Sequence, residues 1–224
     1  MTDRWQAYFR DQGIHERTWL QAAVTHWVFH ETLYGMMQRH CPPPARVLDI
    51  GCGPGFSDLY LHSAGYDVTG VDNDEAIVTL ARDFSKRLGI PARFEQADAS
   101  DLSSFHDRFD LVYSCGVLEH FDRDVTVRLL EEQARCAPRV LIQIPTKYTS
   151  YAAAITDERI YSIDQLKAIV RDAGLHVSSA FGYGELTVTP AQVWIRRLLP
   201  RAVWRVLQNR GYGYSMAVLG VRAA

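Results

Sequence analysis

From residue 46 onward, short apolar runs alternate with amphipathic stretches of helical period. The apolar runs predict five successive strands, at Arg46–Ile50, Asp67–Val71, Ala92–Gln96, Phe109–Ser114 and Arg139–Ile144. The stretches between them predict helices, at Phe56–Ser63, Asp74–Leu88 and Asp124–Cys136. This order is typical of an α/β fold, a doubly wound parallel sheet with helices on both faces.

Beyond the fifth strand, the pattern predicts one more helix and two late strands. Ser162 and Gln165 have the spacing of a capping box, and Gly174 follows as a stop, so the helix is predicted over Ser162–Ala173. The late strands are predicted at Val177–Tyr183 and Ser215–Val221.

Residues 185–211 separate these two strands and are predicted to form a helical insert, with the helical pattern over Thr189–Asn209. The segment from Trp194 to Arg205 mixes arginines with bulky apolar residues. That composition suits attachment to a membrane surface. Inserts at strand ends more often set substrate choice, so we favour a substrate lid. Pro200 is expected to break a single long helix.

The first 41 residues are predicted to form an N-terminal helical cap or lid on the following domain, 42–224. Pro42, Pro43 and Pro44 form a stiff break after it. The cap is too short to hold a core of its own. Its expected apolar stripe consists of Trp19, Leu20, Ala23, Trp27, Val28 and Leu33.

Composition narrows the class of protein. The chain has 224 residues, of which 47% are hydrophobic, and a formal net charge of −2, so we expect a globular domain that does not bind nucleic acid. We find no signal-peptide core and no apolar run that could span a membrane, which favours a cytoplasmic protein. No cysteine pair has metal-type spacing, and we expect no metal. The cysteines are expected to be buried and reduced; they are Cys41, Cys52, Cys115 and Cys136.

A glycine-rich loop follows the first predicted strand. Asp49 ends the apolar run, and glycines alternate after it, at Gly51, Gly53 and Gly55, with Cys52 between the first two. Glycines let the backbone turn sharply and approach a ligand closely. A dinucleotide would place its pyrophosphate here, but the Asp49 carboxylate would repel it and attract a cation instead.

Acidic residues also follow the next two strands. Asp72 and Asn73 end the second strand, where a carboxylate can accept hydrogen bonds from both hydroxyls of a ribose. Asp98 and Ala99 follow the third strand, where a carboxylate can accept from an exocyclic amine such as that of adenine. Each acid has a simpler interpretation as a helix cap or a turn former. Together they fit an adenosine with a cationic tail.

On these residues the chain resembles the class I S-adenosylmethionine-dependent methyltransferases, in their small-molecule branch. Val47–Phe56 matches the family's first motif, and Phe109 to Phe121 resembles its strand-four motif. The resemblance covers roughly residues 40–184. It implies a seven-stranded Rossmann-like sheet whose last strand is antiparallel. It implies S-adenosyl-L-methionine as cofactor, bound by the glycine loop and the acids above, with Ser114 and Tyr8 as further contacts. A nicotinamide enzyme is disfavoured, because Phe56 stands where its motif needs glycine.

Methyl transfer from a sulfonium requires mainly positioning and desolvation, so no fixed catalytic residue is implied. Where the acceptor must lose a proton, the candidate bases are His120, Tyr148, Tyr151 and Glu158. His120 and Tyr148 are the preferred pair, although His120 has an alternative role as a histidine packed under the cofactor. Aromatic residues at the N-terminus are candidates to close over the sulfonium, and these are Trp5, Tyr8 and Phe9. Lys147 is a candidate contact for an acidic acceptor.

We expect a transferase that methylates O, N or C of a small molecule, in secondary metabolism. An alternative is chemistry on the aminobutyrate arm of the same cofactor, such as cyclisation to azetidine-2-carboxylate with release of methylthioadenosine. A third is a non-catalytic subunit, against which the intact loop and acids argue. The acceptor and the oligomeric state stay open.

Overall fold

The computed structural model describes residues 6–9, 14, 18–148, 158–184, 194–195 and 197–223. Two predicted site residues, Trp5 and Tyr151, lie outside the described residues, as does the first part of the predicted insert helix. The chain divides into two compact units, Met1–Val112 and Tyr113–Ala224. The predicted boundary between a cap and a domain at 41/42 stays a prediction.

Seven strands form one mixed sheet in the order β3-β2-β1-β4-β5-β7-β6. β1 pairs in parallel with β2, which pairs in parallel with β3, whereas β7 is antiparallel to both β5 and β6. This confirms the predicted doubly wound sheet with an antiparallel last strand. The strands are β1 Arg46–Ile50, β2 Asp67–Asp72, β3 Arg93–Gln96, β4 Leu111–Cys115, β5 Arg139–Pro145, β6 Leu175–Tyr183 and β7 Ser215–Arg222.

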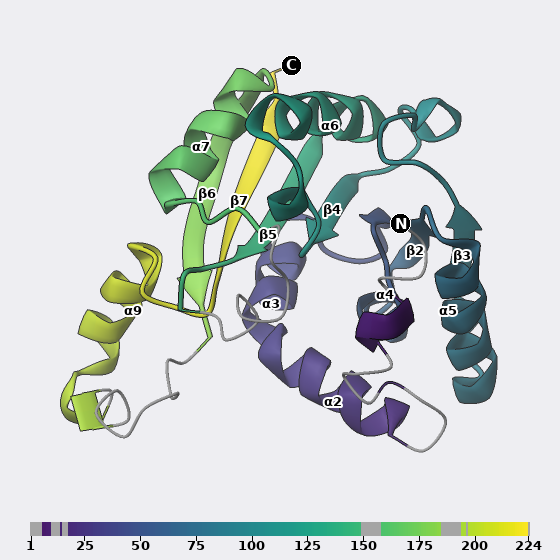
Figure 1. Cartoon of the computed structure of the whole chain (residues 1–224), viewed down its shortest axis with the longest axis horizontal. Coiled ribbons are helices and arrows are strands. Elements are labelled where there is room, and N and C mark those ends of the chain that lie inside the picture. The colour runs from purple at the N-terminus through teal and green to yellow at the C-terminus, as the bar shows by residue number, and fades with distance from the viewer. Residues whose placement is uncertain are drawn as a thin grey trace. The chain divides into compact units, whose positions relative to one another are not determined.

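In the first unit, helices and a short 3-10 turn accompany β1 to β3 (Figure 1). Their bounds are α2 Trp19–Phe29, α3 Glu31–His40, α4 Phe56–Ser63, α5 Glu75–Leu88 and η1 Ser103–Phe105. Asp74 caps the start of α5, with its carboxylate accepting from Ala76 N, and Gly89 caps its end in the left-handed conformation. α2 packs on α4 and α5 through a cluster that includes Ala23, Phe56 and Phe84.

The described residues from Trp19 to His40 are helical, as predicted, but the helix is interrupted and its buried face differs from the prediction. The helical region breaks at His30 into two helices, and two residues of the predicted stripe are exposed, Leu20 at 49% and Val28 at 70%. Adjacent residues on a helix point about 100° apart, so Leu20 and Val28 cannot face inward with Trp19 and Trp27. The buried face of α2 is instead centred on Ala23.

The second unit contains η2 Leu118–His120, α6 Arg123–Cys136, α7 Ile163–Asp172 and α9 Arg201–Asn209. α7 lies along β6 and beside α6 (Figure 1). The predicted capping box is present, with Ser162 Oγ accepting from Gln165 N. Pro200 does end one helical segment, and α9 begins at Arg201.

α9 packs tightly against β6. A Cβ at Gly182 of β6 would lie only 1.9 Å from the carbonyl oxygen of Gln208 in α9. The Gln208 side chain donates to Gly184 O at 3.0 Å. Glycine at position 182 is therefore what permits the close approach.

Candidate functional site

The glycine loop is fixed by backbone hydrogen bonds to the next strand. Gly51 N and Cys52 N both donate to Val71 O, at 2.8 and 3.0 Å. The three glycines of the loop have φ of 71°, 54° and 75°, values that favour glycine. Gly55 also lacks room for a side chain, because a Cβ there would lie 2.6 Å from the Phe94 ring. Conformation and packing together require the glycines that the sequence motif contains.

Asp72 connects this loop to the turn after β2. Its carboxylate accepts from Gly53 N and from Asp74 N, each at 3.1 Å. Burial raises the pKa of Asp72, and these two hydrogen bonds oppose the rise. An ionised carboxylate has about four acceptor sites, so the anchored group retains capacity for the two hydroxyls of a ribose.

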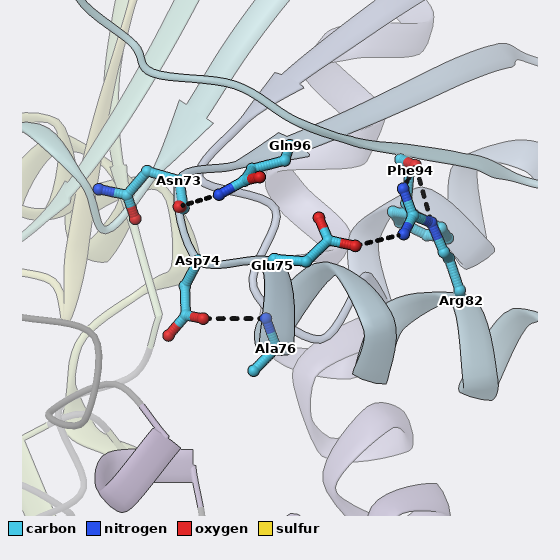
Figure 2. Close-up of polar contacts among 7 residues, drawn as sticks. All are labelled: Asn73, Asp74, Glu75, Ala76, Arg82, Phe94 and Gln96. Carbon is cyan, nitrogen blue, oxygen red and sulfur yellow. Dashed lines mark hydrogen bonds and ion pairs between the residues drawn. The ribbon is translucent and has the colours of Figure 1, made fainter.

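The turn between β2 and α5 is held from several sides (Figure 2). Gln96 Nε2 donates to Asn73 O at 3.0 Å, and Asp74 caps α5. Arg82 of α5 donates to Phe94 O and pairs with Glu75. Asn73 itself is exposed, and its side chain points away from Gln96 in Figure 2. The ends of β2 and β3 are therefore fixed relative to each other, with Asn73 at their edge.

Asp98 lies in the loop after β3, as predicted, and it forms a turn. Its Oδ1 accepts from Ser100 N at 2.8 Å and from Ser100 Oγ at 2.7 Å, which lowers its pKa. Asp98 is exposed and Ala99 is half-buried. Just before them, Ala97 N donates to Asp72 O at 3.0 Å, which ties this loop to the end of β2. The turn-forming role of Asp98 and a contact with a ligand are compatible, because both Ser100 bonds end on the same oxygen.

Asp49 faces a second buried acid that sequence analysis missed. Asp49 on β1 is 3% exposed and Asp58 on α4 is fully buried. Burial raises the pKa of Asp58 well above its usual range, and the nearby Asp49 carboxylate raises it further. Burial and the neighbouring carboxyl therefore both favour the protonated form of Asp58. The residue that could have indicated the burial of Asp58 is Gly70 on β2, because a Cβ there would lie 2.7 Å from Asp58 Oδ1.

The described part of the N-terminus lies against the glycine loop. Gln6 Nε2 donates to the Asp74 carboxylate at 3.1 Å. The Phe9 ring is the nearest group to Gly53, 3.1 Å from the position that a Cβ would occupy there. Tyr8 packs edge-on against Phe9, with ring centroids 5.4 Å apart. Two of the three predicted N-terminal aromatics are therefore at or next to the loop.

α2 and α3 are attached to the start of α4 through polar side chains. Ser57 Oγ is within hydrogen-bonding distance of His26 Nε2 at 2.9 Å and of Tyr34 Oη at 3.0 Å. Trp27 Nε1 donates to Phe56 O at 2.6 Å. Burial lowers the pKa of His26 to about 4, so the ring is neutral at physiological pH.

In the second unit, Ser114 lies near the end of β4, and its role as a cofactor contact stays a prediction. It is 1% exposed, and its Oγ has no hydrogen-bond partner among the described residues. The next residue, Cys115, is half-buried, and its thiol donates to Gln143 Oε1 at 2.9 Å. The other three cysteines are buried, as predicted, and none of the four forms a disulfide.

Three titratable side chains meet beyond the end of β4. Glu119, His120 and Glu158 each place a ligand-type atom within 4.8 Å of the other two. The Glu119 side chain is 2% exposed and that of His120 is 10% exposed. Arg159 brings Glu158 into place, since Arg159 N donates to Glu119 O at 2.8 Å and its guanidinium pairs with Asp122. Two of the predicted candidate bases, His120 and Glu158, thus come together with a further carboxyl group, that of Glu119.

The segment after β5 positions Tyr148. Tyr148 N donates to Thr146 Oγ1 at 3.2 Å, and Thr146 is bonded to Tyr214 O and Gly213 O. The Tyr148 ring stacks on Tyr212 with centroids 5.8 Å apart. Lys147 is exposed, and its Nζ lies 5.1 Å from the centre of the Tyr148 ring.

Residues 47–138 match the family model described as "Methyltransferase domain". A ubiquinone biosynthesis O-methyltransferase from Azorhizobium caulinodans is 35% identical over 75 residues, which are 34% of this chain and 30% of that protein. The chain therefore matches about a third of the length of that relative.

Solved structures share the whole fold. Magnesium protoporphyrin IX methyltransferase from Synechocystis, with bound SAH, has a TM-score of 0.68 at 18% identity over 99% of this chain and 94% of its own. A structure of a Haloferax volcanii complex between the Trm112 methyltransferase activator and a candidate methyltransferase has a TM-score of 0.71 at 22% identity. The match covers 100% of this chain and 97% of the matched chain. Residues 47–138 are therefore similar to a methyltransferase domain, and the chain as a whole has the fold of these solved methyltransferases.

Proposed function

We propose that this protein transfers the methyl group of S-adenosylmethionine to an O, N or C atom of a small molecule. The observation that carries the proposal is the arrangement at the ends of β1 and β2. There, a left-handed glycine loop is bonded to Asp72, beside the buried Asp49–Asp58 pair. A role in secondary metabolism and a cytoplasmic location are part of the proposal.

We assign each acid a role in binding the cofactor. Asp72 would accept hydrogen bonds from the ribose hydroxyls, and Asp98 would accept from the adenine amine. The buried Asp49–Asp58 pair would attract the ammonium group of the aminobutyrate arm. When bound, the cofactor supplies an electrophilic methyl on a good leaving group. The Pro54 position, which has no N–H, suits a cofactor without a phosphate.

The second unit supplies the groups for the acceptor. His120 is the proposed general base, because a neutral imidazole can take a proton near pH 7. The neighbouring carboxyls of Glu119 and Glu158 would orient the ring and stabilise the imidazolium that forms. Tyr148, fixed by stacking on Tyr212, is the second candidate.

A second candidate function is attack on the aminobutyrate arm of the cofactor, including its own cyclisation. The packing of Phe9 against Gly53 favours it, because an aromatic lid over the loop suits a site closed to an external acceptor. The two functions differ in the nucleoside they release, S-adenosylhomocysteine for methyl transfer and methylthioadenosine for the alternative.

The test is an incubation of the protein with S-adenosylmethionine, first alone and then with a panel of phenols, amines and activated carbon acids. We expect S-adenosylhomocysteine only when an acceptor is present. Methylthioadenosine formed without any acceptor would replace the first proposal by the second. A control with Asp72→Ala separates enzymatic turnover from spontaneous breakdown of the cofactor.

A further inference from the structure

The C-terminal part of the chain carries an unusual charge distribution. Residues 186–224 contain six arginines and no Asp, Glu, Lys or His. Because the formal net charge of the chain is −2, the first 185 residues carry −8. Five of the six arginines lie between positions 194 and 210. The protein is thus acidic except for one strongly basic segment.

The same segment exposes large apolar side chains. Trp194, Ile195 and Leu198 are 64%, 53% and 77% exposed, and Val203 and Val206 are 43% and 51% exposed. Val203 and Val206 are three residues apart in α9, so these two side chains lie on one face of that helix. We refer to the five exposed side chains together as the 194–206 apolar face.

This face is not needed to hold α9 in place. α9 packs on β6 through Gln208, which bonds to Gly184 O, and through Trp204, which is 7% exposed. Val203, Arg205 and Val206 point elsewhere and are exposed. Figure 1 shows α9 at the margin of its unit, with one end beside the end of β6 and the rest extending away from the strand. An apolar face bordered by arginines therefore remains on the surface after the helix has packed.

We propose that the segment from Trp194 to Arg210 binds the surface of an anionic membrane. Tryptophan and aliphatic side chains would enter the interface between headgroups and acyl chains, and the arginines would extend to the phosphates. Charge complementarity selects this partner, because the segment is uniformly positive and anionic lipids attract such segments by about 1 kcal/mol per basic residue. The attachment is peripheral. Among the residues that the structure describes, no helix has the length and apolar character to cross a bilayer.

The experiment measures co-sedimentation of the full chain with vesicles of phosphatidylcholine alone or with about a third phosphatidylglycerol. We expect binding to the anionic vesicles that weakens as salt is raised. The charge variant Arg201→Gln/Arg205→Gln is expected to bind about 30-fold more weakly, at about fivefold per arginine. Leu198→Asp tests the apolar contribution and is expected to weaken binding at least tenfold. Neither variant touches Trp204 or Gln208, and their melting temperatures check the fold.

Val28→Asp is the matched control, because Val28 is as exposed as Leu198 but lies on α2. It should bind like the unaltered protein. Absence of binding to anionic vesicles, or equal losses in Val28→Asp, would overturn the proposal. Sedimentation velocity without lipid supplies a further test: a stable dimer that Leu198→Asp dissociates would show that a second copy covers this face. None of these measurements depends on methyl transfer.

Discussion

The two compact units differ in how their functional groups are brought together. In the first, the residues after β1 and β2 are held by backbone groups of the two turns, as the Asp72 carboxylate is by Gly53 N and Asp74 N. In the second, Glu119 and His120 meet Glu158 only through the fold, because Arg159 N bonds back to Glu119 O. The glycine loop and its acids can therefore be recognised from a sequence motif, whereas the Glu119–His120–Glu158 cluster cannot.

The variant with the largest expected effect is His120→Gln, which tests whether the cluster in the second unit is catalytic. If His120 is the general base, kcat should fall about 10²- to 10⁴-fold while cofactor affinity is unchanged. The pH dependence of the remaining rate should also lose its acidic limb, because no imidazole is left to protonate. Steady-state kinetics and calorimetry with S-adenosylhomocysteine would measure the two effects separately. An unchanged kcat with a lowered melting temperature would assign His120 a packing role.

Chelation is the control for the same cluster. We expect EDTA to leave activity unchanged, since the sequence predicts no metal. Loss of activity on chelation and its recovery with Mn²⁺ would instead make Glu119, His120 and Glu158 a metal site, because carboxylates and imidazole suit such ions.

Gly55→Ala tests how tightly the first unit is built. The new Cβ would lie 2.6 Å from the Phe94 ring and 3.1 Å from Ala81 Cβ, at a φ of 75°. Left-handed strain of about 1–2 kcal/mol and overpacking of about 1–3 kcal/mol together predict a loss of about 3 kcal/mol in the free energy of unfolding. Urea denaturation measures it.

Two other glycines separate these contributions. Gly89 also has a positive φ, but a Cβ added there would have no atom within 4 Å. Gly89→Ala should therefore lower the free energy of unfolding only by the backbone strain, about 1–2 kcal/mol. Gly35→Ala, in α3 and without neighbours within 4 Å, should stabilise the protein by about 0.5–1 kcal/mol. Equal losses at Gly55 and Gly89 would contradict the packing argument.

These contrasts explain what the sequence could predict. The strands and the loop glycines follow from periodicity and motif, since each is specified within a few neighbouring residues, whereas the antiparallel end of the sheet was implied by the family resemblance. Asp58 was missed because an acid on a helix is expected to face solvent, and only the facing Gly70 makes room for it inside. Leu20 and Val28 were misplaced because periodicity alone does not say which part of a wide apolar stripe meets a neighbour.

Asp72→Ala tests whether the anchored carboxylate binds the cofactor. Loss of two hydrogen bonds to a charged group predicts about 100-fold weaker binding of S-adenosylhomocysteine, at about 1.5–3 kcal/mol each less partial replacement by water. Titration calorimetry measures it. Asp101→Ala is the matched control, because Asp101 is an exposed acid whose carboxylate accepts turn hydrogen bonds from Ser103. Affinities within twofold of each other would remove Asp72 from the site.

The smallest expected effect concerns the attachment of α2 to α4. His26 titrates near 6.5 when unfolded and at about 4 when folded, so the folded state binds fewer protons between these values. The stability that the neutral ring provides is complete above pH 6.5 and is lost as the pH falls toward 4. Because the ring keeps partial contact with solvent, we expect the loss to be about 1 kcal/mol. Melting temperatures followed by tryptophan fluorescence should fall through this window. His26→Gln retains a partner for Ser57 but cannot titrate, so its melting temperature should vary less with pH; an identical pH profile would show that other groups cause the loss.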